Sequence, residues 1–118
     1  MSYDIYLNDR VTGQPLLLDV RHQVRGGTYC LGDTRECWLN ITYNYSRYYY
    51  EVFGDKGIRA IFGLTGAESI PLLKEAISKL GDETSSDYWE ATPGNAKRSL
   101  CQLLAFALLR PDGVWDGD

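Results

Sequence analysis

The sequence ECWLNITYNY, residues 36–45, decides the fold because it holds the clearest strand pattern of the chain. Every second position is apolar or aromatic, in the order Cys37, Leu39, Ile41, Tyr43 and Tyr45. The positions between them hold one indole and three short polar groups, in the order Trp38, Asn40, Thr42 and Asn44. Successive side chains of a strand point to opposite faces of its sheet. We therefore expect one face of this strand in the core and the other turned outward.

A second strand is predicted near the N-terminus. Tyr3, Ile5 and Leu7 occupy alternate positions, which indicates a strand with one buried face. A polar turn over residues 8–13 would let residues 15–18 return as the other strand of a hairpin. These two segments would extend the sheet that residues 36–45 begin.

The segment between these strands is predicted to hold a loop and one more strand. Gly26 and Gly27 permit backbone angles that other residues avoid, so a loop is expected there. Residues 28–31 would then form a strand before the turn at Gly32 and Asp33. The count is about four strands.

The strongest helix prediction covers residues 92–110. Thr92 suits the N-cap, Pro93 the first helical position, and Pro111 ends the run. Apolar residues occupy nearly every side of this helix: Leu100, Cys101, Leu103, Leu104, Phe106, Leu108 and Leu109. We expect burial on most of its circumference, either inside the domain or partly under a second subunit, so a homodimer is possible.

Two further helices are predicted before it. Ser46 suits the cap of a short helix that ends at Gly54, although its three tyrosines would also suit a strand. The longer helix is expected to begin near Ser69, which places Pro71 in the first turn, despite capping-box spacing at residues 65–68. Its apolar stripe consists of Ile70, Leu73, Ile77 and Leu80. Residues 57–62 suit either a strand or a buried connector.

Together these elements predict a single α+β domain over residues 1–118. We expect a mainly antiparallel sheet of about four strands with two C-terminal helices packed on one face. The chain length and the 44% hydrophobic content are sufficient for one continuous core.

Charge and cysteine content limit the class of function. Twelve Lys and Arg against sixteen Asp and Glu give a net charge of -4, which disfavours direct binding of nucleic acid. Three cysteines disfavour a secreted disulfide framework, and no apolar run is long enough to indicate a membrane span. We expect a cytoplasmic protein of a bacterium or an infected bacterial cell.

No catalytic residue, metal site or cofactor is predicted. His22 is the only histidine, and it lies in a predicted loop between two arginines. Cys30 and Cys37 lack the close spacing of zinc ligands. Phosphate-loop, dinucleotide and nucleophile-elbow motifs are absent from the sequence. A binding protein is favoured over an enzyme, and a small enzyme that uses only Asp, Glu or Tyr stays open.

A ligand site is predicted on the outward face of residues 36–45. Trp38 would stack on a ligand, while Asn40, Thr42 and Asn44 would select it by hydrogen bonds. The alternative is that helices cover this face and Trp38 is part of the core.

Nearby residues would complete such a site. Arg25, before the two glycines, and Asn95 and Arg98, at the start of the last helix, would suit a phosphate or a nucleotide.

Two long segments read GGTYCLGDTRECWLNITYNYSRYYYEVFGDKGIRAIFGLTGAESIPLL (residues 26–73) and DYWEATPGNAKRSLCQLLAFALLRPDGVWDGD (residues 87–118). In these segments the chain resembles short proteins encoded by bacteriophages, prophages and related mobile elements. The resemblance covers almost the whole chain and implies no activity and no site residue. It implies a small phage accessory protein that binds a host factor or sequesters a signalling molecule.

Two functions therefore stand as hypotheses. The first is a non-enzymatic accessory factor that holds a small or nucleotide-like ligand. The second is an inhibitor of a host defence protein, which would dock through an acidic and aromatic surface that includes Asp82, Glu83 and Asp87.

Overall fold

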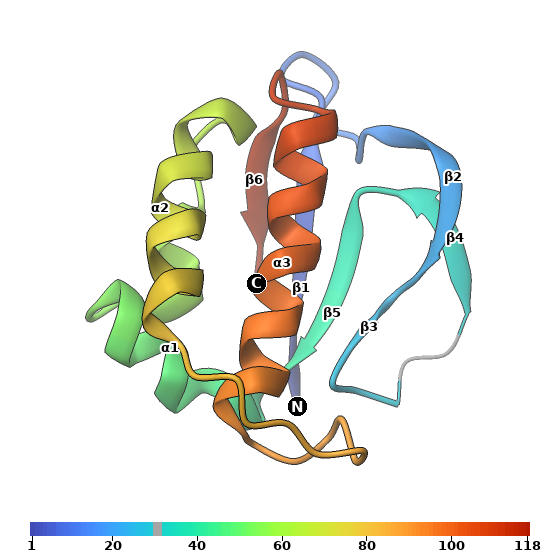
Figure 1. Cartoon of the computed structure of the whole chain (residues 1–118). Coiled ribbons are helices and arrows are strands. Elements are labelled where there is room, and N and C mark those ends of the chain that lie inside the picture. The colour runs from blue at the N-terminus through green and yellow to red at the C-terminus, as the bar shows by residue number, and fades with distance from the viewer. Residues whose placement is uncertain (30–31) are drawn as a thin grey trace.

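Two β-sheets and three α-helices build the computed structural model, which describes residues 1–29 and 32–118 (Figure 1). The strands are β1 (Ser2–Asn8), β2 (Leu17–Gln23), β3 (Arg25–Gly26), β4 (Asp33–Glu36), β5 (Trp38–Thr42) and β6 (Val114–Gly117). The helices are α1 (Ser46–Phe53), α2 (Gly66–Lys79) and α3 (Pro93–Leu109), with short 3-10 helices η1 (Tyr43–Tyr45) and η2 (Gly57–Ile61). The predicted α+β class is confirmed.

The larger sheet has the strand order β3-β5-β1-β6 and is mixed. β1 is antiparallel to both β5 and β6, whereas β3 is parallel to β5. The parallel pair was not expected, and it arises because the chain bends sharply at Cys37, between β4 and β5. The Cys37 N–H donates to Leu16 O at 2.8 Å, and its carbonyl accepts from the Leu7 N–H at 2.9 Å, so the bend is tied to both neighbours.

The predicted hairpin between the N-terminal strand and residues 15–18 is confirmed only next to its turn. There the antiparallel Asn8–Pro15 bridge is flanked by hydrogen bonds from Leu16 N–H to Leu7 O and from Asp9 N–H to Gln14 O. β2 instead pairs with β4 in a separate two-stranded sheet. The strand predicted at residues 28–31 is not seen at Thr28 and Tyr29, and Cys30 and Leu31 lie outside the described residues.

The central strand is shorter than its sequence pattern predicts. It ends at Thr42, whose Oγ1 accepts a hydrogen bond from the Asn44 N–H and so caps η1. The predicted short helix, α1, is confirmed and ends before Gly54. Ser46 is its first residue rather than its cap, because the Ser46 hydroxyl is hydrogen-bonded to the Tyr3 hydroxyl at 2.6 Å.

The start of α2 was wrongly predicted. The helix begins at Gly66, directly after a complete capping box in which Thr65 and Glu68 exchange hydrogen bonds. The box satisfies two N–H groups that have no partner within the helix, which favours the early start. Pro71 therefore lies inside the helix, at an exposed position.

Both long helices lie side by side over one face of the larger sheet (Figure 1). The α3 boundaries match the prediction, with Thr92 as cap and Pro93 first. Leu100 and Leu103 are fully buried while Leu108 and Leu109 are 54% and 62% exposed, so the domain alone does not bury most of the helix, and cover by a second subunit stays a prediction. After α3 the chain returns as β6, which the sequence analysis missed, and β6 places Trp115 in the core.

Candidate functional site

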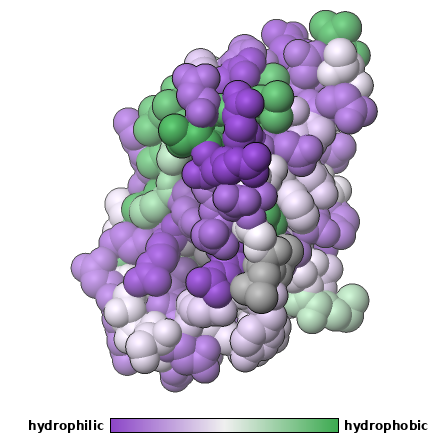
Figure 2. Space-filling view, turned by 90° about the vertical axis from the view of Figure 1, so that its right-hand side faces the viewer, coloured by the Kyte–Doolittle hydropathy of each residue, from purple (hydrophilic) through white to green (hydrophobic). Residues whose placement is uncertain are grey.

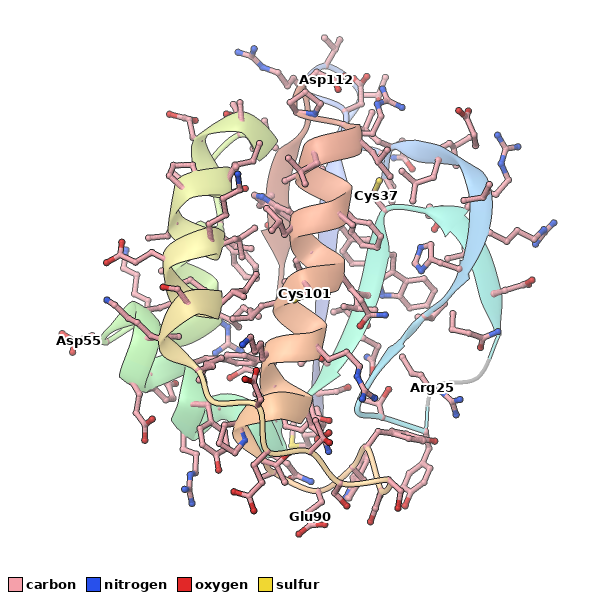
Figure 3. All side chains as sticks on the ribbon, in the orientation of Figure 1. Arg25, Cys37, Asp55, Glu90, Cys101 and Asp112 are labelled. Carbon is pink, nitrogen blue, oxygen red and sulfur yellow. The ribbon has the colours of Figure 1, made fainter. Side chains whose placement is uncertain are left out.

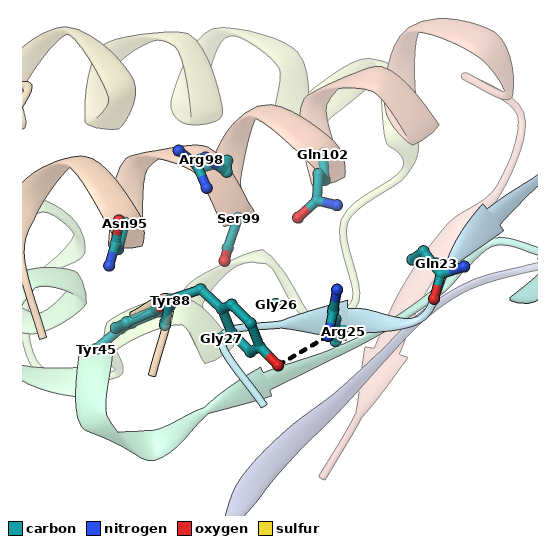
Figure 4. A pocket seen from close by; sticks show the side chains of 10 residues that line it. All are labelled: Gln23, Arg25, Gly26, Gly27, Tyr45, Tyr88, Asn95, Arg98, Ser99 and Gln102. Carbon is teal, nitrogen blue, oxygen red and sulfur yellow. Dashed lines mark hydrogen bonds between the residues drawn. The ribbon is translucent and has the colours of Figure 1, made fainter. Parts of the chain in front are cut away.

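A cavity of about 220 Å³ lies between β3 and the N-terminal half of α3 (Figure 4). Segments far apart in the sequence meet around it. Its lining consists of Gln23, Arg25, Gly26, Gly27, Tyr45, Tyr88, Asn95, Arg98, Ser99 and Gln102. Three of the predicted ligand-binding residues, Arg25, Asn95 and Arg98, are among them.

Two glycines allow the backbone of this cavity wall to come close to its neighbours. A Cβ on Gly26 would lie 2.9 Å from Ile41 Cγ1, closer than real Cβ atoms come, and 3.0 Å from Ser99 Oγ, which is a tight contact. Gly27 has a φ of +76° and lies against the Tyr45 ring. The Gly-Gly pair therefore lets β3 pass directly under α3.

Two guanidinium groups reach the cavity from opposite walls. Arg25 donates from Nη1 to the Tyr88 hydroxyl at 2.8 Å, and its Cζ lies 4.5 Å from the centre of the Tyr88 ring. Arg98 is exposed on α3, and its guanidinium forms no hydrogen bond or ion pair with another described residue. The cavity is therefore cationic, with one arginine held in place and one available to a ligand.

The floor of the cavity is a neutral phenol. Tyr45 is only 1% exposed, and its hydroxyl donates to the Tyr88 carbonyl. Burial raises the Tyr45 pKa to about 12, while the nearby Arg98 lowers it and Asp87 raises it by smaller amounts. The hydroxyl therefore stays protonated at neutral pH, and its single proton is donated to the Tyr88 carbonyl.

Two predicted ligand residues position the loop that carries Tyr88. Asn95 Nδ2 donates to the carbonyl oxygens of Asp87 and Glu90, at 3.2 and 3.1 Å. From the other side, Asn44 Nδ2 donates to Trp89 O at 3.1 Å. Their amides are thus occupied by the protein itself, so Asn44 and Asn95 shape the site rather than present free groups to it.

The other predicted site residues do not reach the cavity. Trp38 stacks on Tyr6, with ring centres 5.8 Å apart, and its Nε1 donates to Asp4 Oδ1 at 3.0 Å. Asn40 Nδ2 donates to the same carboxylate oxygen at 2.8 Å, and Thr42 is fully buried. Trp38 and Asn40 thus donate to a cross-strand neighbour, and Thr42 accepts from the Asn44 N–H, which corrects the expectation of a free recognition face.

The alternative prediction, that helices cover this face and bury Trp38 in the core, is also wrong. The β1–β5 register pairs Tyr6 with Trp38, on the face opposite Ile5 and Leu7, which belong to the core. The helices cover that core face, and Trp38 stays partly exposed. It therefore lies neither under a helix nor in the cavity.

The lining side chains that were not predicted for the site include Gln23, Tyr45, Tyr88, Ser99 and Gln102. A signal was present for two of them, because Asn95, Ser99 and Gln102 follow one another at spacings of four and three on a helix that is otherwise largely apolar. Such spacing places side chains on one face of a helix. Figure 4 shows Ser99 and Gln102 pointing from α3 toward β3.

Cys37, Cys101 and His22 lie in different parts of the fold and do not form a common site. Cys37 is buried at the bend before β5, whereas Cys101 is exposed on α3, well away from it (Figure 3). His22 Nε2 lies 2.6 Å from Glu36 O, which ties β2 to β4, and its ring packs on Phe106. Across the described ranges, no three His, Cys, Asp or Glu residues gather as metal ligands would.

Comparison with known proteins gives no relative: no family model, curated protein or solved structure matches the chain. The resemblance to phage-encoded proteins therefore stays a prediction. Among residues 1–29 and 32–118, no helix has both the length and the apolar character needed to cross a bilayer.

We predict that alkaline pH destabilises the fold through the buried acids Cys37, Tyr45 and Tyr49, and burial raises the Tyr49 pKa well above 10.0. Burial raises the Cys37 pKa from 9.0 to about 11 and the Tyr45 pKa from 10.0 to about 12. A raised pKa gives stability that is full below the unfolded value and is lost as pH rises through the folded value. The melting temperature should therefore fall between about pH 9 and 12.

Variants separate these contributions. C37A should flatten the curve of melting temperature against pH between about pH 9 and 11, and Y45F should reduce the fall above about pH 10, where Tyr49 also contributes. C101A is the matched control, because Cys101 is exposed. A C37A profile parallel to that of the wild type would show that the Cys37 thiol does not contribute.

Proposed function

We propose that this protein is a non-enzymatic binding protein that holds a small anionic ligand between β3 and α3. The ligand class that fits best is a phosphate ester, including nucleotide-like molecules. The cavity volume suits a phosphate with an attached sugar-sized group, and a larger ligand would extend over the rim.

One observation carries this proposal: Arg25 and Arg98, 73 positions apart in the sequence, line the same cavity. Guanidinium groups bind phosphate and carboxylate oxygens through paired hydrogen bonds. Arg98 has no acidic partner among the described residues, so no ion pair with them must be broken before it binds an anion.

Neutral groups around the two arginines would give selectivity. Gln23 and Gln102 each offer one donor and one acceptor group, and the Tyr88 ring already stacks with Arg25. Hydroxyl groups or a base edge of the ligand would match the amides. The resemblance to phage proteins favours an accessory factor that sequesters such a molecule.

The test is a melting-temperature screen with inorganic phosphate, sugar phosphates and nucleotides. A ligand present at a hundred times its dissociation constant should stabilise the wild type by about 2.7 kcal/mol. R98Q and R25Q should each abolish most of this stabilisation. R98Q should also leave the ligand-free melting temperature nearly unchanged, because the Arg98 side chain is exposed.

R10Q is the matched control, because Arg10 is an equally exposed arginine in the turn after β1, away from the cavity lining. It should keep the full response to ligand. If no phosphate compound stabilises the folded wild type, or if R10Q and R98Q lose the response equally, the proposal fails.

A second function, inhibition of a host protein through an acidic and aromatic surface, is favoured by the loop before α3. Glu83, Asp87 and Glu90 are exposed there, next to Trp89, whose ring stacks on the 68% exposed Tyr29 at 4.6 Å. Asp82 is less available, because Lys97 pairs with it at 2.6 Å. Loss of a captured host protein in E83K/D87K, but not in R25Q/R98Q, would select this function.

A further inference from the structure

An apolar patch lies at the other end of α3 from the cavity. It consists of Leu17, Val20, Leu108 and Leu109, which are between 53% and 67% exposed. Figure 2 shows hydrophobic residues gathered over the end of α3 and the start of β2, at the upper left of the view. Exposed apolar residues of this size are normally scattered, so their grouping indicates a contact surface.

The patch includes a hollow of about 300 Å³. Its walls are residues 17–20 of β2 and the last turn of α3, with Leu109 and Arg110. Arg110 closes one end by donating from Nη1 to Leu17 O at 3.0 Å. The hollow can receive apolar side chains from a second molecule.

β2 presents one edge of a two-stranded sheet beside this hollow, and its Leu18 carbonyl accepts a hydrogen bond from Arg35 Nε at 2.9 Å. Its ladder with β4 joins Leu17 to Glu36 and then resumes only at His22 and Thr34, so residues 18–21 have no register partner. No other described strand pairs with β2. The edge of β2 that faces away from β4 therefore has no partner strand among the described residues, and such an edge can pair with another chain.

We propose that β2 pairs with β2 of a second copy, antiparallel and centred on Val20. In that register Val20 faces its own copy, and Asp19 of each chain faces Arg21 of the other. The sequence LLDVRHQ is thus complementary to itself, as a two-fold interface requires. Leu17, Leu108 and Leu109 would be covered by the same contact.

The charges at the centre are available for this pairing. Asp19 has no ion pair with a described residue, and Arg21 has only an exposed one, to Asp33 at 3.4 Å. Exposed pairs of this type contribute little. This self-complementary charge pattern favours a second copy over an unrelated partner, and the inference is independent of the proposed ligand.

The test measures sedimentation of the full chain over a range of concentrations. The wild type should show a concentration-dependent dimer. D19R places arginine opposite arginine at two positions, and R21D places aspartate opposite aspartate, so each variant alone should dimerise about tenfold more weakly. An equal mixture of the two should restore the dimer, because every cross-strand pair is then Asp with Arg.

V20E should abolish the dimer, while V11E, at a 93% exposed valine in the turn after β1, should not affect it. Circular dichroism and melting temperature confirm that each variant is folded. A wild type that is monomeric at every concentration, or a dimer unaffected by V20E and by the mixing experiment, would overturn the proposal.

Discussion

Replacing Trp115 by alanine is expected to lower the free energy of unfolding by about 3–5 kcal/mol. The indole is 1% exposed in the middle of the core, and its Nε1 donates to Ser69 Oγ at 2.8 Å. W115A removes the largest fully buried side chain and leaves the buried Ser69 hydroxyl without this donor. Urea unfolding followed by circular dichroism measures the change.

W38A is the matched control, because it removes the same side chain from a partly exposed position. Its loss comprises the stacking on Tyr6 and one hydrogen bond to Asp4, so about 1–2 kcal/mol is expected. Equal losses for W115A and W38A would contradict the described core, and so would a loss below about 1 kcal/mol for W115A.

Replacing Gly27 by alanine is the second large effect, at about 2–5 kcal/mol. Part of it is conformational, because Gly27 has a φ of +76°. The remainder comes from overlap of the new methyl group with the Tyr45 ring, which would have to leave the cavity floor. G27A should therefore also weaken ligand binding.

G13A separates the two contributions. Gly13 has nearly the same φ, +72°, but a Cβ there would meet no atom within 4 Å. Only the conformational cost, about 1–2 kcal/mol, should remain. If G27A is no more destabilising than G13A, the contact between Gly27 and Tyr45 is not close in solution.

Elements with local signals were predictable from the sequence. Thr92 and Pro93 begin α3 as expected, because capping depends only on neighbouring residues. The alternation of Tyr3, Ile5 and Leu7 likewise gave β1 and its buried face. The predicted start of α2 was wrong because the Thr65 capping box stabilises the early start more than Pro71 inside the helix destabilises it.

Features that depend on distant partners were not predictable. β6 is four residues long, and nothing near Trp115 indicates that β1 is its partner. The same holds for the bend at Cys37, which is fixed by hydrogen bonds to Leu7 and Leu16. Strand pairing of this kind is decided by tertiary context.

The candidate site was also predictable only in part. The sequence indicated anion-binding chemistry at Arg25 and Arg98, and the fold brings these residues to one cavity. The recognition face around Trp38 failed because Asp4, on the neighbouring strand, accepts hydrogen bonds from both the indole and Asn40. The sequence of β5 alone does not indicate that Asp4 of β1 lies opposite it and accepts these hydrogen bonds.

The order of strands also has a consequence for synthesis. β1 is translated before β5 and β6 but lies between them in the sheet, and β6 follows the other described elements. A chain that folded without β6 would keep an open edge at β1 and a gap where the Trp115 indole packs. Chaperones that bind exposed strands should therefore engage a chain truncated before β6 more than the chain that includes it.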